Sequence, residues 1–290
     1  MTDRLHKTEK KIIVAGASGY LGQHIIRELQ SRKLRFKAIV RNPSKLHHLN
    51  LKPDELISAK VTQPHTLKNI FSEDDIIIST VGITRQKDGL TYKDVDFQAN
   101  MNLLLEAKAA GASKFVYISV LNGESMRDLK IVEAKEAFVD ALKISPIDYS
   151  VIRPNGFFSD MKDFLQMAKR GSVYLFGKGE HTLNPIHGAD LAKVVIDSIE
   201  LKKAELEVGG PDILTQNEIA ALALKAYDKK IKVYHLPDWL RTGLLAFLRT
   251  FTSSKTYGPY EFFLSMMAQD NVAPRYGVIR LKDFFQEEAD

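Results

Sequence analysis

The segment IIVAGASGYLGQHIIREL (12–29) limits the possible folds more than any other part of the chain. A short apolar run leads straight into three glycines, Gly16, Gly19 and Gly22, and these lead straight into a stretch with helical spacing. In a strand–turn–helix unit, Gly16 allows the tight turn, Gly19 lets the backbone approach a pyrophosphate, and Gly22 lets the helix pack closely on the sheet. The helix start then offers amides and a positive dipole end to phosphates. The pattern predicts dinucleotide binding, with a purely structural turn as the alternative.

Short apolar, β-rich runs alternate with helical patterns through the first half of the chain. Several runs are continuously apolar, as strands covered on both faces should be. We expect strands at 11–17, 35–41, 55–60, 74–80, 114–120 and 148–154, and helices at about 20–31, 43–50, 64–71, 94–110 and 127–143. The repeated strand–helix–strand order predicts an α/β fold, a doubly wound parallel sheet of the Rossmann type.

The pattern becomes less regular after Pro154. We expect a helix from 188, a further strand at 204–210 and a helix from 215, where Thr215 and Glu218 have capping-box spacing. The sequence therefore predicts two domains. Residues 1–154 would form a Rossmann domain, and residues 155–290 a smaller C-terminal α/β substrate module, partly interleaved with the sheet domain.

Composition argues against several classes of protein. The 290 residues include 41 Lys and Arg and 36 Asp and Glu, and the formal net charge of +5 is too small to indicate a nucleic-acid partner. The chain has no cysteine, which excludes disulfides and thiol chemistry and is compatible with a reducing cytoplasm. We therefore expect a cytoplasmic protein.

No run approaches the roughly 18 uncharged apolar residues that a membrane-spanning helix needs, so we expect no transmembrane segment. The nearest candidate, LPDWLRTGLLAFLRTFTS (236–253), is interrupted by Arg241 and Arg249. It predicts a packed amphipathic helix, with an interfacial membrane helix as the alternative.

The end of the second expected strand, AIVRNPSKL, indicates which dinucleotide binds. NAD-binding proteins usually place an acidic residue there, about 20 residues beyond the glycine turn, for the ribose 2′-hydroxyl. Arg41 occupies this place, and Lys45 follows it. Because a guanidinium fork suits a 2′-phosphate, the sequence predicts NADP in preference to NAD. A solvated arginine at a strand end is the alternative.

The chain resembles atypical short-chain dehydrogenase/reductases in the glycine turn, in Arg41 and in four further segments. These segments are STVG (79–82), YISV (117–120), VIRPNGFFSD (151–160) and NPIHGADLA (184–192). The resemblance is strongest to the NmrA-like and isoflavone-reductase-like branch, and it covers most of residues 11–210. It implies an NAD(P)-binding oxidoreductase that transfers hydride between NADP(H) and a small, apolar or aromatic substrate. Because several members of this branch are thought not to be catalytic, an NADP(H)-binding redox sensor or assembly factor is the alternative. An isomerase or epimerase is a third, weaker interpretation, and neither substrate identity nor oligomeric state follows from the sequence.

The resemblance also implies roles for single residues. The pyrophosphate would be wrapped by Ser18, Gly19, Tyr20 and Leu21, beside Gly16 and Gly22. The adenosine ribose and phosphate side would be lined by Thr80, Val81 and Gly82. The nicotinamide end would be approached by Pro154 and Asn155, and the catalytic positions would be Ser119 and Lys135.

The chain departs from the resembling family at the catalytic tyrosine. The tyrosine of the family's Y-x-x-x-K motif is replaced by Ile131, and neither Tyr92 nor Tyr117 restores the spacing. Lys135 lies beside an apolar helical stripe, and three roles stay open for it. It would be a lysine with its head in water, a ligand of the nicotinamide ribose, or a proton donor if burial lowers its pKa towards neutrality.

Histidines and aromatic residues give weaker signals. His47 and His48 are adjacent and point different ways, and His181 and His187 have no carboxylate or thiol at ligand spacing, so we predict no metal site. His187 is expected to pack in a loop or to line a pocket, and Asp190 to cap a helix. Four aromatic residues are expected in the core or around an apolar pocket: Phe157, Phe158, Tyr174 and Phe176.

Overall fold

The computed structural model describes residues 11–52, 55–84 and 89–289. The chain forms two compact units. The first comprises Met1–Arg153 and Leu191–Leu206, and the second comprises Pro154–Asp190 and Glu207–Asp290. The first unit is therefore discontinuous in sequence.

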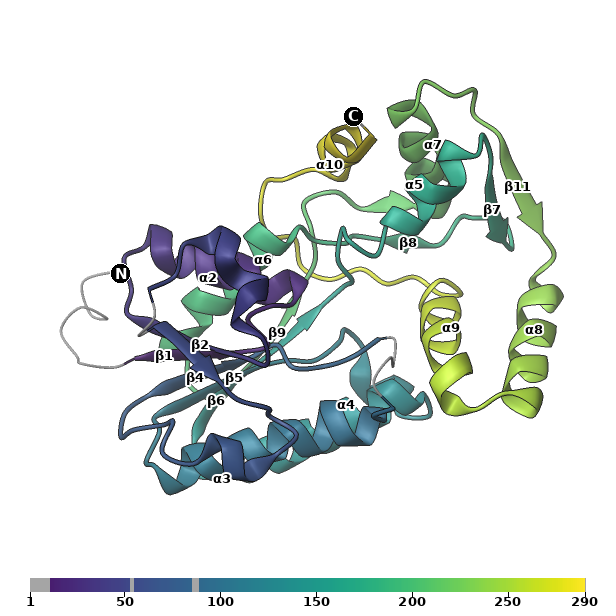
Figure 1. Ribbon diagram of the computed structural model, residues 1–290. Coiled ribbons are helices and arrows are strands. Elements are labelled where there is room, and N and C mark those ends of the chain that lie inside the picture. Colours follow the sequence, from purple (N-terminus) through teal and green to yellow (C-terminus); the bar gives the residue numbers. More distant parts are fainter. Residues whose placement is uncertain (1–10, 53–54, 85–88, 290) are drawn as a thin grey trace. The chain divides into compact units, whose positions relative to one another are not determined.

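A seven-stranded sheet with the strand order β3-β2-β1-β4-β5-β6-β9 forms the centre of the first unit (Figure 1). Its strands are β1 (Ile12–Ala15), β2 (Phe36–Val40), β3 (Leu56–Ser58), β4 (Ile76–Ser79), β5 (Lys114–Ile118), β6 (Asp148–Pro154) and β9 (Ala204–Val208). Neighbouring strands from β3 to β6 pair in parallel. The predicted doubly wound Rossmann-type fold is confirmed.

Helices cover both faces of this sheet. On one face lie α2 (Tyr20–Ser31) and α6 (Gly188–Asp197), and on the other lie α3 (Asn100–Ala109) and α4 (Lys130–Lys143), as Figure 1 shows. The helix α2 buries Leu21, Ile25, Ile26 and Leu29, which recur at helical spacing on one side. Its apolar stripe therefore faces the sheet, and burial of these side chains is what holds the helix in place.

Three of the expected helices differ from the structure. The segment expected as one helix at 94–110 is a π-helix, Lys93–Ala99, followed by α3. The side-chain amide of Asn100 donates to the carbonyls of Val95 and Asp96, and it thereby satisfies groups that an α-helix would pair within its backbone. The helices expected at 43–50 and 64–71 are 3₁₀-helices, Pro43–Leu49 and Pro64–Leu67.

The strand register brings three strand ends together. Ala15 at the end of β1 pairs with Ile39 of β2 and with Ser79 of β4. The turns that follow these three strands therefore lie at one edge of the sheet. Because the strand order reverses between β1 and β4, this edge is where open α/β sheets bind ligands.

The second unit has its own apolar core, which includes Phe158, Phe164 and Phe285. Its helices are α5 (Lys162–Lys169), α7 (Gln216–Ala226), α8 (Asp238–Phe251), α9 (Ser254–Met266) and α10 (Leu281–Ala289). Two small sheets complete it: β7 (Val173–Phe176) pairs in parallel with β11 (Val233–Leu236), and β8 (Thr182–Leu183) pairs antiparallel with β10 (Leu214–Thr215). The capping box predicted at Thr215 and Glu218 is present at the start of α7.

Candidate functional site

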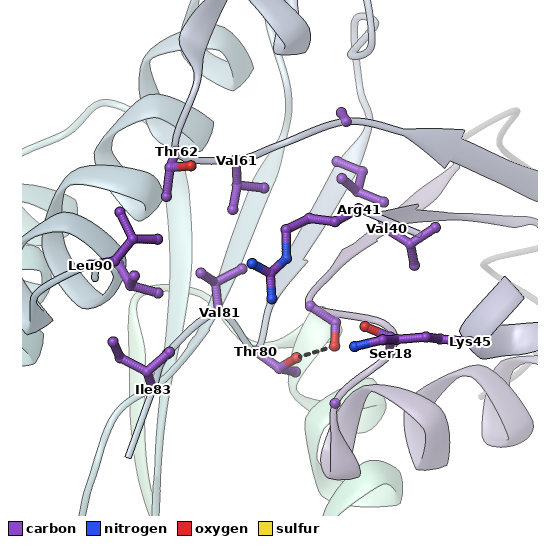
Figure 2. Close-up of a pocket in the computed structure, with 16 residues that line it drawn as sticks. Ser18, Val40, Arg41, Lys45, Val61, Thr62, Thr80, Val81, Ile83 and Leu90 are labelled. Atoms are coloured by element: carbon purple, nitrogen blue, oxygen red, sulfur yellow. Dashed lines mark hydrogen bonds between the residues drawn. The ribbon is translucent and has the colours of Figure 1, made fainter. Parts of the chain in front are cut away.

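A cavity of about 390 Å³ lies at the carboxyl ends of β1, β2 and β4 (Figure 2). Eight residues predicted from the sequence line it: Gly16, Ser18, Gly19, Arg41, Lys45, Thr80, Val81 and Gly82. The remaining lining residues are mainly apolar, and they are Ile39, Val40, Ala59, Val61, Thr62, Ile83, Leu90 and Val95. A volume of this order is typical of small-molecule sites.

The glycine turn has three different physical requirements. Gly16 has a φ of +81°, and a Cβ there would lie 2.5 Å from the hydroxyl oxygen of Thr80. A Cβ at Gly22 would lie 2.3 Å from the carbonyl oxygen of Gly16, so this glycine packs against the turn itself rather than against a strand. At Gly19, φ is −78° and a Cβ would meet only that same oxygen, at 3.3 Å. The fold thus requires Gly16 and Gly22 but leaves the space beside Gly19 open.

The start of α2 is suited to an anion. Within the described residues no side chain caps this helix, and its first turn has no acidic residue. The Gln23 side chain donates to the carbonyl of Ser18, and the amide of Gly19 donates to the carbonyl of Gly16, which shape the turn that precedes the helix. With the open space beside Gly19, these groups fit a pyrophosphate.

Two basic side chains enter the same cavity. Arg41 follows β2, and Figure 2 shows its guanidinium group extending into the cavity that Lys45 also lines. Both residues are exposed. The described lining residues include no carboxylate. The site therefore favours an anionic ligand on this side.

Lys135 forms an ion pair with Asp96 next to the loop that follows β4. Its amino nitrogen lies 2.9 Å from a carboxylate oxygen of Asp96, whose side chain is fully buried, while the Lys135 side chain is 16% exposed. The backbone amide of Ile83 donates to the other Asp96 oxygen. A Cβ at Gly82 would lie 2.6 Å from the carboxylate and 2.9 Å from the amino group. The pair thus lies directly against the loop that lines the cavity.

The electrostatics of this pair contradict two expectations. Burial by itself lowers the pKa of Lys135, but the Asp96 carboxylate outweighs it and raises the pKa above the ordinary value. The lowered pKa that the proton-donor alternative requires is therefore contradicted, and so is the alternative of a lysine with its head in water. The Tyr117 ring lies 5.8 Å from the Lys135 amino nitrogen, and burial raises the pKa of this tyrosine too. Neither group is suited to release a proton at neutral pH.

A family model described as NAD(P)H-binding matches residues 16–202. The chain belongs to this NAD(P)H-binding family. It is 27% identical to the chloroplastic divinyl chlorophyllide a 8-vinyl-reductase of Zea mays, over 97% of this chain and 80% of that protein. It is 26% identical to the photosystem II assembly factor Ycf39 of Guillardia theta, over 78% of this chain and 73% of that protein.

Among solved structures, that of an isoflavone reductase has a TM-score of 0.72 and 18% identity, and the match covers 97% of this chain and all of that one (100%). At this identity the likeness concerns the fold. The family model confirms the predicted NAD(P)-binding family and its NAD(P)H cofactor. Which residues of this NAD(P)H-binding protein contact the cofactor stays a prediction.

Ser119, a predicted catalytic position, belongs to a buried polar network. Its hydroxyl donates to Glu136 at 2.6 Å, and Glu136 also accepts from Arg153 at 2.7 and 2.9 Å. Arg153 contacts Glu205 of β9 as well. Ser119 is only 4% exposed and its hydroxyl proton is engaged, so the structure gives it a structural role. A catalytic role for Ser119 stays a prediction.

The two residues predicted at the nicotinamide end belong to the second unit. Pro154 ends β6, and Asn155 follows it and is 3% exposed. The Asn155 side chain donates to Asn184 and to the backbone carbonyl of Asn271, and its backbone amide donates to the carbonyl of Val208. Asn155 therefore holds three segments of its own unit together, and its contact with a cofactor stays a prediction.

Four other residues singled out in the sequence have defined surroundings. Tyr20 and Leu21 open α2, where Leu21 is buried and the Tyr20 ring contacts His24. Asp190 accepts from the amides of Val278 and Ile279 at 2.8 Å, and its capping of α6 stays a prediction. The His187 ring packs against Phe158, as one of its two predicted roles required.

The expected amphipathic helix at 236–253 corresponds to α8 and is mostly exposed. Of its predicted apolar face only Leu245 is buried, whereas Trp239 is 69% exposed. No helix among the described residues has the length and apolar character needed to cross a membrane. Within the same residues, no three His, Cys, Asp or Glu side chains are grouped as metal ligands.

Sequence reasoning missed Asp96 and Asn100. Asn100 is fully buried, accepts from the Ser79 hydroxyl at 2.5 Å and donates to the carbonyl of Val81, so it holds the loop after β4. Asp96 holds Lys135. Both lie in KDVDFQAN (93–100), where two polar residues four apart interrupt an expected core-facing stretch. That placement on one side of a helix was the available signal.

Proposed function

We propose that this protein binds NADP(H) and uses it to reduce a small, apolar or aromatic carbonyl or conjugated compound. The observation that supports this proposal is the composition of the cavity in the first unit. It combines the open glycine turn with two basic side chains, Arg41 and Lys45, and its described lining has no carboxylate. The 2′-phosphate is the group that distinguishes NADP from NAD, and the positive charges of Arg41 and Lys45 suit its binding.

Each part of the site has a role in this proposal. The amides at the start of α2 hold the pyrophosphate, and Arg41 with Lys45 holds the 2′-phosphate. Lys135, kept charged by Asp96, contacts a hydroxyl of the nicotinamide ribose. NADPH supplies a hydride when bound. Because Ile131 cannot deliver a proton and the pKa of Lys135 is raised, the proton comes from solvent or from the substrate side.

A second candidate function is a non-catalytic NADP(H)-binding assembly factor or redox sensor. Two observations favour it: the tyrosine position is Ile131, and Lys135 is already paired with a carboxylate. The relatives include both kinds of protein, one named as a vinyl-group reductase and one as an assembly factor. The reductase is preferred because the match to it extends over nearly the whole chain.

The two candidates differ in turnover with bound cofactor. We would titrate the wild type with NADPH and NADH and then measure NADPH oxidation with a panel of enones, quinones and vinyl-substituted aromatic compounds. Deuterium transfer from labelled NADPH to product would identify hydride transfer. Gly19→Val is the control for oxidation that does not use the site.

Tight NADPH binding with deuterium transfer supports the reductase. Tight binding without oxidation of any compound in the panel overturns the reductase and supports the second candidate. Equal affinity for NADPH and NADH contradicts the proposed role of Arg41 and Lys45.

A further inference from the structure

A second cavity, of about 520 Å³, lies within the second unit and is separate in its residues from the cofactor cavity. Its walls come from α5, β7, α8 and α9, and every lining residue belongs to this unit. The volume is in the range of sites that enclose small organic ligands, roughly 300–1,000 Å³. Nothing in the proposed role of the first unit uses this cavity.

The walls of the second cavity are mostly apolar and rich in rings and thioethers. They include Phe164, Phe176 and Phe263, with Met167 and Met267 between them. Aromatic rings offer flat surfaces that stack on other rings, and methionine side chains adapt to irregular shapes. Such a lining suits a ligand that contains a ring system.

Three of the large apolar side chains that the structure leaves exposed gather at this cavity. Tyr174 is 51% exposed, Leu244 41% and Tyr260 55%, and each lines it. Exposed apolar side chains are ordinary when scattered, but three around one cavity indicate surface that a ligand covers.

The charged groups of the lining balance one another. Asp163 and Asp238 equal Arg170 and Arg241 in number, and His181 also lines the cavity. Arg241 donates to both carboxylate oxygens of Asp238 at 2.7 and 2.9 Å. An ionic ligand would have to break this pairing or bring an unpaired charge into an apolar space, which is costly. The electrostatics of the cavity therefore favour a neutral ligand.

We propose that this cavity is a binding site for a neutral, largely apolar ring compound, and that such a compound binds there without NADP(H). The inference goes beyond the proposed function, because it concerns a site made only of second-unit residues. If this proposal fails, the proposed cofactor site is unaffected, and if the proposed function fails, this proposal is unaffected.

The test uses the full chain without cofactor and the neutral fluorescent probe N-phenyl-1-naphthylamine. The chain has one tryptophan, Trp239, next in sequence to the lining residue Asp238, so energy transfer from Trp239 reports a nearby probe. We expect saturable binding with transfer. The anionic analogue 8-anilinonaphthalene-1-sulfonate, which has the same rings, should bind about tenfold or more weakly because its charge is not matched.

Two variants make the cavity unsuitable for a neutral apolar ligand in different ways. Ala268→Phe places a ring in the cavity, and Met167→Lys places a charge there; each should weaken binding of the neutral probe about tenfold or more. Ala246→Phe on α8 is the matched control, because Ala246 is exposed and does not line the cavity. A melting curve for each variant shows whether it is folded. Because Met167 is only partly buried, we expect at least the Met167→Lys variant to be folded.

The exposed side of α8 offers a competing place for the probe, since Phe247 is 58% and Phe251 71% exposed. The double variant Phe247→Ser/Phe251→Ser should leave binding unchanged. The proposal is overturned if this variant abolishes binding, if both cavity variants bind the probe as the wild type does, or if the anionic analogue binds more tightly.

Discussion

Lys135 and Asp96 form a pair in which each side chain keeps the other ionised. Burial of Asp96 raises the pKa of its carboxyl, and the lysine opposes that effect at 2.9 Å. Since the carboxylate is fully buried, the lysine is the main reason that it stays charged. The pair therefore connects the stability of the first unit to the shape of the loop at Gly82.

Lys135→Met should destabilise the protein and change how its stability depends on pH. Removing one partner of a buried ion pair costs about 3–5 kcal/mol at neutral pH. The Asp96 pKa, already raised by burial, would then lie further above its unfolded value. A group whose pKa is raised on folding stabilises below the unfolded pKa, and the effect is lost as pH rises through the folded pKa. Denaturant melts should therefore show the variant closest to wild type near pH 4–5, about the ordinary Asp range, and increasingly less stable than the wild type as the pH rises above that range.

The double variant Lys135→Met/Asp96→Asn is the matched control, because it removes both charges. It should recover most of the lost stability and show a flat pH dependence. If the single variant is as stable as the wild type at all pH values, the pair is not the buried ion pair described here.

The same lysine variant tests its proposed contact with the ribose. Loss of a hydrogen bond to a charged group is worth about 1.5–3 kcal/mol, so NADPH affinity should fall roughly 10–100-fold in Lys135→Met. The titration is done near pH 5, where the variant is expected to be folded. Unchanged affinity there would refute the ribose contact.

Arg41→Ala should lower the affinity for NADPH by about 10–100-fold and leave the affinity for NADH nearly unchanged, because only NADPH has a 2′-phosphate. Arg35→Ala is the matched control: this arginine is exposed, precedes the same strand and does not line the cavity. Fluorescence titration of the wild type and both variants with each cofactor measures both effects. A similar loss for NADH would mean that Arg41 contacts a part common to both cofactors.

Prediction from sequence could place residues whose position is set by the local chain and was poorer for residues whose surroundings are set by distant partners. Gly16 and Arg41 could be placed because a turn and a strand end position them directly. The pairing of Lys135 with Asp96 joins two helices 39 positions apart, and no local pattern specifies which acid meets which lysine. The sequence therefore did not show that Asp96 raises the pKa of Lys135.

The turn and the helix that follows it form one element with separable functions. Two of its glycines are needed for folding and the third leaves space for a ligand, as the contacts that a Cβ would make at each position show. This separation allows binding and stability to be altered independently by single substitutions.

Gly19→Val should abolish NADPH binding with only a modest loss of stability, since its φ of −78° is accessible to any residue. Gly22→Ala should instead mainly lower the melting temperature, because its Cβ would lie 2.3 Å from the backbone oxygen of Gly16. Thermal melts and NADPH titrations of both variants check the contrast. Normal cofactor binding by Gly19→Val would show that the phosphate assignment is wrong.

At the scale of elements, strand positions were predicted within a few residues, but the helix type at 94–110 and the helix length at 64–71 were predicted wrongly. Periodicity alone predicted one helix at 94–110. In the structure the side-chain amide of Asn100 donates to the carbonyls of Val95 and Asp96, and Lys93–Ala99 forms a π-helix. At 64–71 the 3₁₀-helix ends at Leu67, and Asn69 has a φ of +62°, which stops a right-handed helix. A hydrophobic pattern records neither a side chain that competes for backbone hydrogen bonds nor a residue with positive φ.

At the scale of the whole molecule, the first unit depends on a segment that comes late in the chain. Residues Leu191–Leu206 supply most of α6 and three of the five residues of β9 to it. The amino group of Lys114, which is 3% exposed, donates to the carbonyl of Leu201, and Arg153 pairs with Glu205. The hydroxyl of Ser150 donates to the carbonyl of Ser198.

A fragment of residues 1–153 should therefore fail to fold, although it contains the glycine turn and six of the strands. It would lack the Leu201 carbonyl that accepts from Lys114, the Glu205 partner of Arg153 and the strand β9 beside β6. Loss of a hydrogen-bond partner from a buried group costs about 1–3 kcal/mol, or more when the group is charged. Circular dichroism melts and NADPH titration measure this. A cooperative melt with normal binding by the fragment would show that the late segment is dispensable.

The same discontinuity sets an order of events while the chain is being synthesised. Since the N-terminal end leaves the ribosome first, the strands up to β6 emerge before residue 206 exists, and the first 37 residues of the second unit, Pro154–Asp190, must emerge in between. During that interval the edge of β6 is an open strand edge, the kind of surface to which other chains add. Nascent chains of this protein are therefore most exposed to mispairing and most dependent on chaperones over one short stretch of translation, which ends when β9 closes the sheet.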